Sequence, residues 1–143
     1  MEETFLSYYF EHLDKGLFKK VFENITYPWE ALAGKNDKLF QFQKSAIKGD
    51  VHSTVIIKGL VQIGQGVVIE PYVVIEGPVI IGENTLVRSH ALIRPYSAIG
   101  QNCVVGHSSE IKNALVMDQA KVASFCFLSS SIFASVIFVP QRL

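Results

Sequence analysis

The most restrictive feature of this sequence is an aliphatic residue that returns every six positions through its middle part. From Val51 to Ile111 the series has eleven consecutive members, and all of them are β-branched. They are Val51, Ile57, Ile63, Ile69, Ile75, Ile81, Val87, Ile93, Ile99, Val105 and Ile111. A strand repeats every two residues and a helix every 3.6, so neither element alone produces a period of six.

A second series lies two residues before the first and contains only small or β-branched residues. Its members are Val55, Val61, Val67, Val73, Val79, Thr85, Ala91, Ser97, Cys103 and Ser109. Two inward side chains separated by an outward one describe a short strand. The other three residues of each six, often with Gly, can turn a corner. The repeat therefore predicts a parallel β-solenoid, in which each strand pairs with the strand one coil away.

This repeat resembles that of the hexapeptide-repeat acyltransferases, which fold as a left-handed parallel β-helix. In that family three edges make a triangular coil of eighteen residues, and the resemblance implies the same coil length and handedness here. The expected fold class is mainly β, a left-handed parallel β-helix with a short N-terminal α-helical cap. The expected domains are the cap at 1–44, the β-helix at 45–128 and an irregular apolar tail at 129–143.

Residues 1–44 carry a helical spacing instead of the six-residue period. The apolar residues at this spacing are Phe10, Leu13, Leu17 and Val21. A break is expected at Gly16, and a second helix is expected to open near Pro28 and to end within 34–37. Because the chain has no net charge, core or docking contacts are a better interpretation of the aromatic residues here than a base-binding platform. We expect this segment to seal the first coil and its open strand edge.

The repeat loses its register after Phe125. The stretch from Ile132 to Val139 is apolar, uncharged and β-prone. It is either a last irregular strand or the remnant of a truncated reading frame, and the sequence leaves both readings open.

One predicted face of the coil has a wholly apolar outward column, made of Val68, Leu86, Val104 and Val122. Large exposed apolar patches usually mark contact surfaces. Three β-helices associate around a threefold axis in the resembled family, so a homotrimer is expected. Cover by residues 1–44 is the alternative.

Composition narrows the possible functions. The 13 basic and 13 acidic residues cancel, so no basic field favours nucleic acid or an anionic membrane. Cys103 and Cys126 have no metal or redox spacing, and no His-x4-His pair of the kind used by hexapeptide carbonic anhydrases occurs, so no metal is expected. Because there is no basic-then-apolar leader and no bilayer-length apolar run, we expect a cytoplasmic protein with no membrane partner.

Three local motifs make the resemblance more specific. They are Ala91-Leu-Ile-Arg94-Pro95, Ser109-Glu-Ile-Lys112-Asn-Ala114 and Lys121-Val-Ala-Ser124-Phe. The chain resembles the acetyltransferase half of the bifunctional enzymes that make UDP-N-acetylglucosamine, which acetylate glucosamine 1-phosphate from acetyl-CoA. The resemblance implies a sugar phosphate or sugar nucleotide as ligand, and acetyl-CoA as cofactor if the chain is active. It also implies that Arg94 and Lys112 bind the substrate.

The spacing of Arg94 and Lys112 supports a shared site. Eighteen residues place them on adjacent coils, about 4.8 Å apart. Two cations this close repel unless an anion lies between them, and a phosphate suits the guanidinium fork. The alternative is a solvated charge ladder of Lys58, Glu76, Arg94 and Lys112, in which Glu76 pairs with Arg94.

The chain departs from the resembled family at its general base. Ser124 stands where the family has a histidine, and serine has no pKa near neutrality. His52 is expected in the same column as Ser124, four coils below, and His90 and His107 are expected as corner or surface residues.

The resemblance implies further coils that hold acyl-CoA, which we expect to be missing here, and the sequence printed above has no Gly-rich phosphate loop for nucleotidyl transfer. Two functions therefore stay open. The first is an acyltransferase-family enzyme that acts on an amino sugar or sugar nucleotide, and the second is a non-catalytic trimeric binding or scaffold module.

Overall fold

The structure is a computed structural model that describes residues 16–134. It begins with two short helices, α2 (Lys19–Phe22) and α3 (Glu30–Leu39). Strands of two or three residues follow. They are β1 (Ala46–Ile47), β2 (Asp50–Val51), β3 (Ile56–Lys58), β4 (Val61–Ile63), β5 (Val68–Ile69), β6 (Val74–Glu76), β7 (Val79–Ile81), β8 (Leu86–Val87), β9 (Leu92–Ile93), β10 (Ser97–Ile99), β11 (Val104–Val105), β12 (Glu110–Lys112), β13 (Leu115–Val116), β14 (Lys121–Val122), β15 (Phe127–Ser129) and β16 (Ile132–Phe133).

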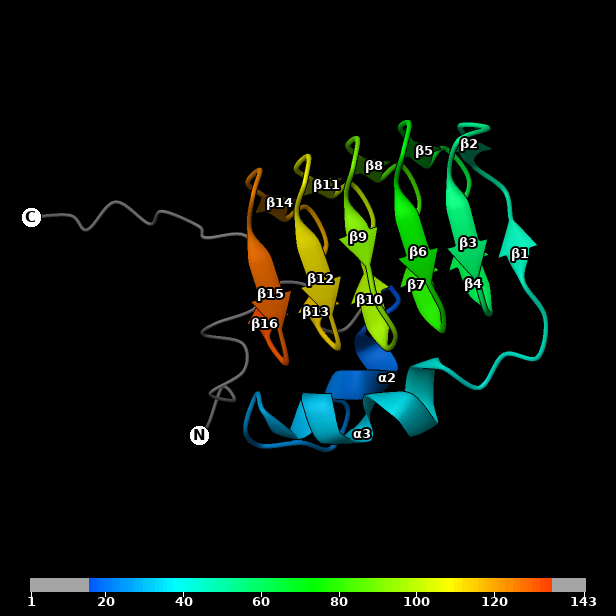
Figure 1. The fold of residues 1–143 in the computed structure, drawn as a ribbon. Coiled ribbons are helices and arrows are strands. Elements are labelled where there is room, and N and C mark those ends of the chain that lie inside the picture. The colour runs from blue at the N-terminus through cyan, green and yellow to red at the C-terminus, as the bar shows by residue number, and fades with distance from the viewer. Residues whose placement is uncertain (1–15, 135–143) are drawn as a thin grey trace, which may run out of the picture.

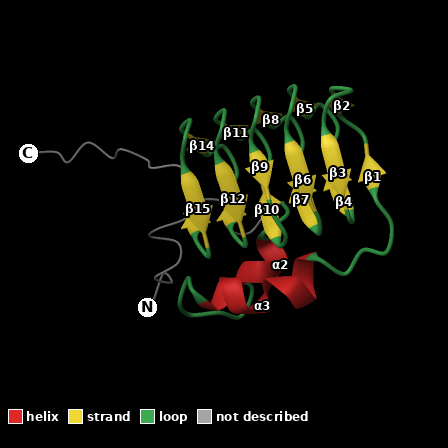
Figure 2. Ribbon diagram, in the orientation of Figure 1, coloured by secondary structure: helices red, strands yellow, loops and turns green. Residues whose placement is uncertain are grey.

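The strands form three parallel sheets, one for each face of the coiling chain (Figure 1). Sheet A has the order β1-β4-β7-β10-β13-β16, sheet B the order β2-β5-β8-β11-β14, and sheet C the order β3-β6-β9-β12-β15. Every third strand joins the same sheet, so the chain makes about five turns of a parallel β-solenoid. This confirms the predicted fold class, with strands dominating and the two helices near the N-terminus (Figure 2).

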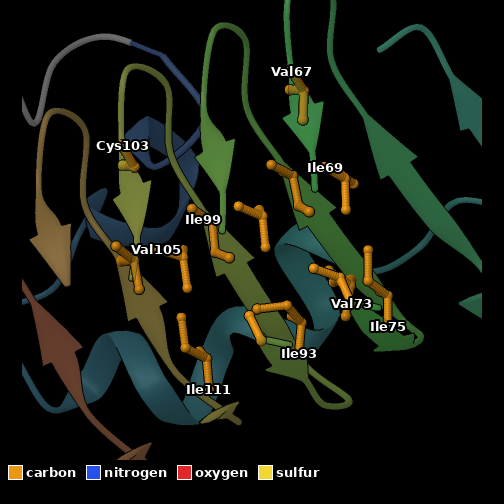
Figure 3. Close-up of a cluster of buried hydrophobic side chains, with 14 of the residues drawn as sticks. Val67, Ile69, Val73, Ile75, Ile93, Ile99, Cys103, Val105 and Ile111 are labelled. Atoms are coloured by element: carbon orange, nitrogen blue, oxygen red, sulfur yellow. The ribbon is translucent and has the colours of Figure 1, made fainter. Parts of the chain in front are cut away.

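The six-residue series forms the core of the solenoid. Its nine members from Ile63 to Ile111 are each at most 2% exposed, and Figure 3 shows several of them converging on the interior. Val51 and Ile57, in the first coil, are partly buried against this cluster. Burial of each such side chain contributes about 1.5–3 kcal/mol, so the repeat supplies most of the driving force for coiling.

The second series places buried hydroxyl groups at several corners. Each hydroxyl donates a hydrogen bond to a backbone carbonyl in the next coil. The bonds run from Thr85 to Gly100 at 2.7 Å, from Ser97 to Ile111 at 3.2 Å and from Ser109 to Ala123 at 2.8 Å. Because each polar group has a partner, small polar residues are tolerated here inside an apolar core.

One corner is a residue shorter than the corners below it, and the register changes there. Ile93 pairs with Ile111, eighteen residues later, but Ala98 pairs with Leu115, only seventeen later. The shortened corner contains Asn113, whose φ is 50°. The next inward residue is therefore Val116, which pairs with Ile99.

The short corner makes two sequence-based assignments wrong. Val122 pairs with Val105 and is 2% exposed, so it belongs to the core and Lys121 takes the outward position. Ser124 does not share a column with His52. It lies one coil above His107, because the next amide, that of Phe125, donates to the His107 carbonyl at 3.0 Å.

The helices pack along the outer face of sheet A (Figure 1). The buried residues of the helices and Phe18, which directly precedes α2, meet the outward residues Ile80, Ala98 and Leu115 of that sheet; the helix residues are Val21, Phe22, Ala31 and Leu39. The expected position over the first coil is therefore wrong for the described part of the segment. The reason is the apolar outward column of sheet A, which the helices bury.

Helix α3 continues through 34–37, where the sequence predicted its end. It continues because Ala31, Lys35 and Leu39, spaced four residues apart, all face the solenoid and are buried. Phe10 and Leu13 of the first predicted helix lie outside the described residues.

The solenoid continues past the point where the sequence repeat fades. β15 pairs with β12, and β16 pairs with β13. The missing residue at the short corner hides this register from a strict count of six. Ile132 and Phe133 thus form a strand, whereas 135–143 lie outside the described residues.

Candidate functional site

Arg94 and Lys112 lie at the same corner of the solenoid, where sheet C gives way to sheet A. Arg94 follows β9, and Lys112 ends β12, the strand paired with β9. The Arg94 amide donates to the Ile111 carbonyl at 2.7 Å, which keeps the two coils in register. The structure therefore stacks the two residues, as their spacing predicts.

The guanidinium of Arg94 lies between two carboxylates. Its Nε is 3.7 Å from Glu76 Oε2, and its Nη1 is 3.4 Å from Glu110 Oε1. The pair with Glu76 is the one that the charge-ladder alternative predicts. Glu110 was missed by the sequence reasoning, although its place two residues before Lys112 makes it outward-facing on the same strand.

The corner keeps capacity for an anion despite these ion pairs. The three side chains of the Arg94 pairs are about one-third exposed, and such pairs contribute at most about 1 kcal/mol each. A guanidinium has five N–H donors, so several remain for a ligand. Lys112 is exposed and forms no ion pair with any residue between 16 and 134. Lys58, in the same column, adds a further positive charge. The three basic side chains and the two carboxylates together carry one net positive charge.

Ser124 lies at the opposite end of sheet C. It precedes β15, whose last residue, Ser129, pairs with Lys112. The length of the strand therefore separates Ser124 from the Arg94–Lys112 corner within one chain. Phe127, the first residue of β15, is 63% exposed and pairs with Glu110.

Three histidines lie near the corner between sheets B and C, as corner or surface residues. The Nδ1 of His52 accepts the amide of Thr54 at 3.2 Å. The ring of His90 lies 5.2 Å from that of Tyr72, and the ring of His107 lies 4.7 Å from that of Phe125. These histidines lie at the starting ends of the sheet C strands, whereas Arg94 and Lys112 lie at the other ends. The single chain therefore does not bring the histidines close to Arg94 and Lys112.

A buried lysine lies next to the candidate site. Lys35 of α3 is 1% exposed, and its Nζ donates a hydrogen bond to Asn113 Oδ1. Asn113 directly follows Lys112 and donates through Nδ2 to Ser130 Oγ at 3.2 Å. Burial lowers the pKa of Lys35 from its ordinary 10.5 to about 8. The sequence signal for this contact was the position of Lys35 between Ala31 and Leu39.

The cysteines offer no reactive pair. Cys103 is buried, its thiol donates to the Met117 carbonyl at 3.0 Å, and burial raises its pKa to about 11. Cys126 is partly exposed and is also free. Within residues 16–134 no group of three or more His, Cys, Asp or Glu side chains could hold a metal ion. No helix of the same range is long and apolar enough to cross a membrane.

A shallow hollow of about 130 Å³ lies on the first coils of sheet A. It is lined by Ala46, Lys48, Gln62, Ile63, Gly64, Ile80 and Ile81. Pockets for small ligands commonly measure about 300–1,000 Å³. The hollow is therefore too small to enclose a sugar nucleotide, and the Arg94–Lys112 corner remains the stronger candidate.

Comparison with known proteins finds similarity over the part of the chain that carries the six-residue repeat. The model of the GMPPB C-terminal domain matches residues 75–139. The chain is 42% identical over 117 residues to the bifunctional protein GlmU of Methanococcus maripaludis, a match that covers 82% of this chain and 28% of that protein. It is also 42% identical over 105 residues to the bifunctional protein GlmU of Methanococcus aeolicus, covering 73% of this chain and 25% of that protein.

The chain thus spans about a quarter of the length of the curated relatives that it matches. The matches to both GlmU proteins include most of the described solenoid, and the GMPPB model begins at Ile75 within it. Repeat, fold and relatives agree: the chain is a parallel β-solenoid built on a six-residue repeat, and it is similar over most of its length to a part of the two GlmU proteins.

Proposed function

We propose that this chain binds the phosphate of an amino-sugar phosphate or a sugar nucleotide at the Arg94–Lys112 corner. The observation that carries the proposal is the stacking of these two cations on adjacent coils. The 42% identity to GlmU proteins, whose family acts on such ligands, supports the choice of ligand class. The guanidinium would bind two phosphate oxygens, with the ammonium as a second point charge.

Acetyl transfer from acetyl-CoA to the amino group of the sugar is the activity that the resemblance implies. A base near the amine is required for it. Ser124 cannot serve as that base, and within one chain it lies at the far end of sheet C from Lys112. The geometry of the single chain therefore favours ligand binding over acetyl transfer. A non-catalytic binding or scaffold module is the second candidate function.

A homotrimer of the resembled kind remains part of this proposal. Its original basis was an apolar outward column that included Val122. Because Lys121 occupies that position, the apolar part of the column is limited to Val68, Leu86 and Val104.

Calorimetric titration with UDP-N-acetylglucosamine and with glucosamine 1-phosphate tests the binding site. Arg94→Ala and Lys112→Ala should each weaken affinity about tenfold or more, the loss of one charge-assisted contact. Arg88→Ala, on sheet B, is a matched control and should leave affinity unchanged. Absence of binding by the unaltered chain would overturn the proposal.

A second assay separates the two functions. Acetyl transfer from acetyl-CoA to glucosamine 1-phosphate should be measured for the unaltered chain and for Ser124→His. Turnover by the unaltered chain would establish the enzymatic function. Binding without turnover in the unaltered chain would favour the binding module.

A further inference from the structure

Helix α3 contacts the Arg94–Lys112 corner at two points, one on each coil. Lys35 donates a hydrogen bond to Asn113 Oδ1, and Asn113 directly follows Lys112. The ring of Phe40, at the end of α3, lies edge-on to the ring of Tyr96, with the centroids 5.7 Å apart. Tyr96 stands two residues after Arg94. The helix is therefore tied to both coils directly beyond their cations.

The peptide bond between Lys112 and Asn113 is held by the coils on either side. The Asn113 amide donates to the Pro95 carbonyl at 3.1 Å, and the Lys112 carbonyl accepts the Ser130 amide at 3.1 Å. Because Pro95 directly follows Arg94, the same ladder includes the backbone next to both cations. The side chain of Asn113 accepts from Lys35 through Oδ1 and donates to Ser130 Oγ through Nδ2 at 3.2 Å. Asn113 thus connects α3 to the backbone from which Lys112 projects.

Lys35 and Asn113 each depend on the other. Asn113 turns the short corner with a φ of 50°, in the left-handed region that residues other than Gly adopt rarely. Such a conformation persists where surrounding contacts fix it. Lys35 is 1% exposed, and Asn113 is its only hydrogen-bond partner among residues 16–134, so its amine would lose that partner if the corner moved.

We infer that Lys35 is a positioning residue for the proposed phosphate site: through Asn113 it holds the corner in the conformation that stacks Lys112 on Arg94. The inference rests on the proposed function, since it concerns affinity for the same ligand. Lys35 is buried and does not touch the ligand itself. Its effect on binding passes through Asn113 and the backbone of the corner.

The protonation state of Lys35 gives this role a signature in pH. A charged donor makes a hydrogen bond roughly twice as strong as a neutral one. Burial lowers the pKa of Lys35 to about 8, so its bond to Asn113 is strongest below pH 8 and weakens as the pH rises through that value. Ligand affinity should therefore fall over the same range of pH.

The other charged groups on the elements that pack together here are exposed or bonded elsewhere. Within residues 16–134 none of them forms an ion pair with Lys35. They are Lys19, Lys20 and Glu23 at α2, Glu30, Asp37 and Lys38 of α3, Glu76, Arg94, Glu110 and Lys112 at the corner, and Asp118 after β13.

Calorimetric titration with UDP-N-acetylglucosamine at pH 7 and pH 9 tests the inference. At pH 7, Lys35→Met should bind about three- to tenfold more weakly than the unaltered chain, the equivalent of about one hydrogen bond. At pH 9 the ratio of the two affinities should shrink toward one, and titration of the ligand cancels in this ratio. Lys38→Met, an exposed change on the same helix, is the control and should match the unaltered chain at both pH values.

A second variant separates the hydrogen bond from the backbone conformation. Asn113→Gly leaves the left-handed conformation accessible and removes the acceptor, so it should weaken affinity at pH 7 about as much as Lys35→Met. The double variant Lys35→Met/Asn113→Gly should bind no more weakly than either single variant, because all three remove the same link. Circular dichroism at each pH identifies any variant that fails to fold.

The outcomes distinguish the positioning role from the site itself. If the unaltered chain binds the ligand, three results would overturn the role of Lys35 and leave the phosphate site intact. They are equal affinities of Lys35→Met and the unaltered chain at pH 7, a loss of the same size at both pH values, and losses that add in the double variant. Absence of binding by the unaltered chain would overturn the proposed function and the inference with it.

Discussion

The buried amine of Lys35 predicts an unusual dependence of stability on pH. The perturbation is Lys35→Met, which keeps an unbranched side chain of similar length and removes the charge. Lys35 is 1% exposed, and its only hydrogen-bond partner among residues 16–134 is Asn113 Oδ1. Burial of an ammonium without a carboxylate partner is unfavourable, and the pKa of Lys35 is therefore lowered to about 8.

The magnitude follows from the pKa in the folded and unfolded chains. Between pH 8 and pH 10.5 the unfolded lysine is still protonated while the folded one is mostly neutral. The unfolded chain then binds more protons, so the stability of the folded chain rises with pH in this window. At about 1.4 kcal/mol per pKa unit, the free energy of unfolding should rise by roughly 2 kcal/mol between pH 8 and pH 10 from this group alone. Lys35→Met should lack that rise.

Urea unfolding at several pH values measures the effect. Trp29, the single tryptophan, precedes α3 and reports on the helical segment by fluorescence, while circular dichroism follows the sheets. The difference between the unaltered chain and the variant is the decisive quantity, because all other titrating groups cancel in it. Lys38→Met, an exposed change on the same helix, should reproduce the unaltered profile. A difference that stays constant within about 0.5 kcal/mol from pH 8 to pH 10 would refute the reasoning.

Three further predictions concern the core and the thiols. Ile93→Ala, at a position 0% exposed, should lower the free energy of unfolding by about 2–5 kcal/mol in urea titration, and a loss below about 1 kcal/mol would contradict its place in the core. Gly82→Ala should be strongly destabilising in the same assay because its Cβ would lie 2.6 Å from backbone of the next coil, whereas Gly34→Ala in α3 meets nothing closer than 3.8 Å and should stabilise by up to about 1 kcal/mol; equal effects would argue against the coil stacking. Cys126 should react with a thiol reagent much faster than Cys103, whose pKa burial raises to about 11, and equal rates would contradict that burial.

The fold could be predicted from the sequence because its repeat arises from local backbone geometry. A strand followed by a corner takes six residues, so the inward positions from Ile63 to Ile111 could be assigned without any knowledge of distant contacts. The stacking of Arg94 on Lys112 followed from the same count, once the coil length was taken from the resembled family. The partner Glu110 also had a local signal, because it points outward from the same strand as Lys112.

The remaining features depended on contacts between distant parts of the chain. The composition of the sequence does not reveal that one corner is a residue short. This corner turns Val122 inward and Lys121 outward, and it moves Ser124 away from the column of His52. The helices could have covered any apolar face, and the burial of Ile80, Ala98 and Leu115 decided that they lie on sheet A. The sequence by itself thus determined the period, the core and the class of fold, because these arise within six residues. Only the tertiary structure decided which face is covered, which charges are paired and which column is left open, because those depend on packing between coils and helices.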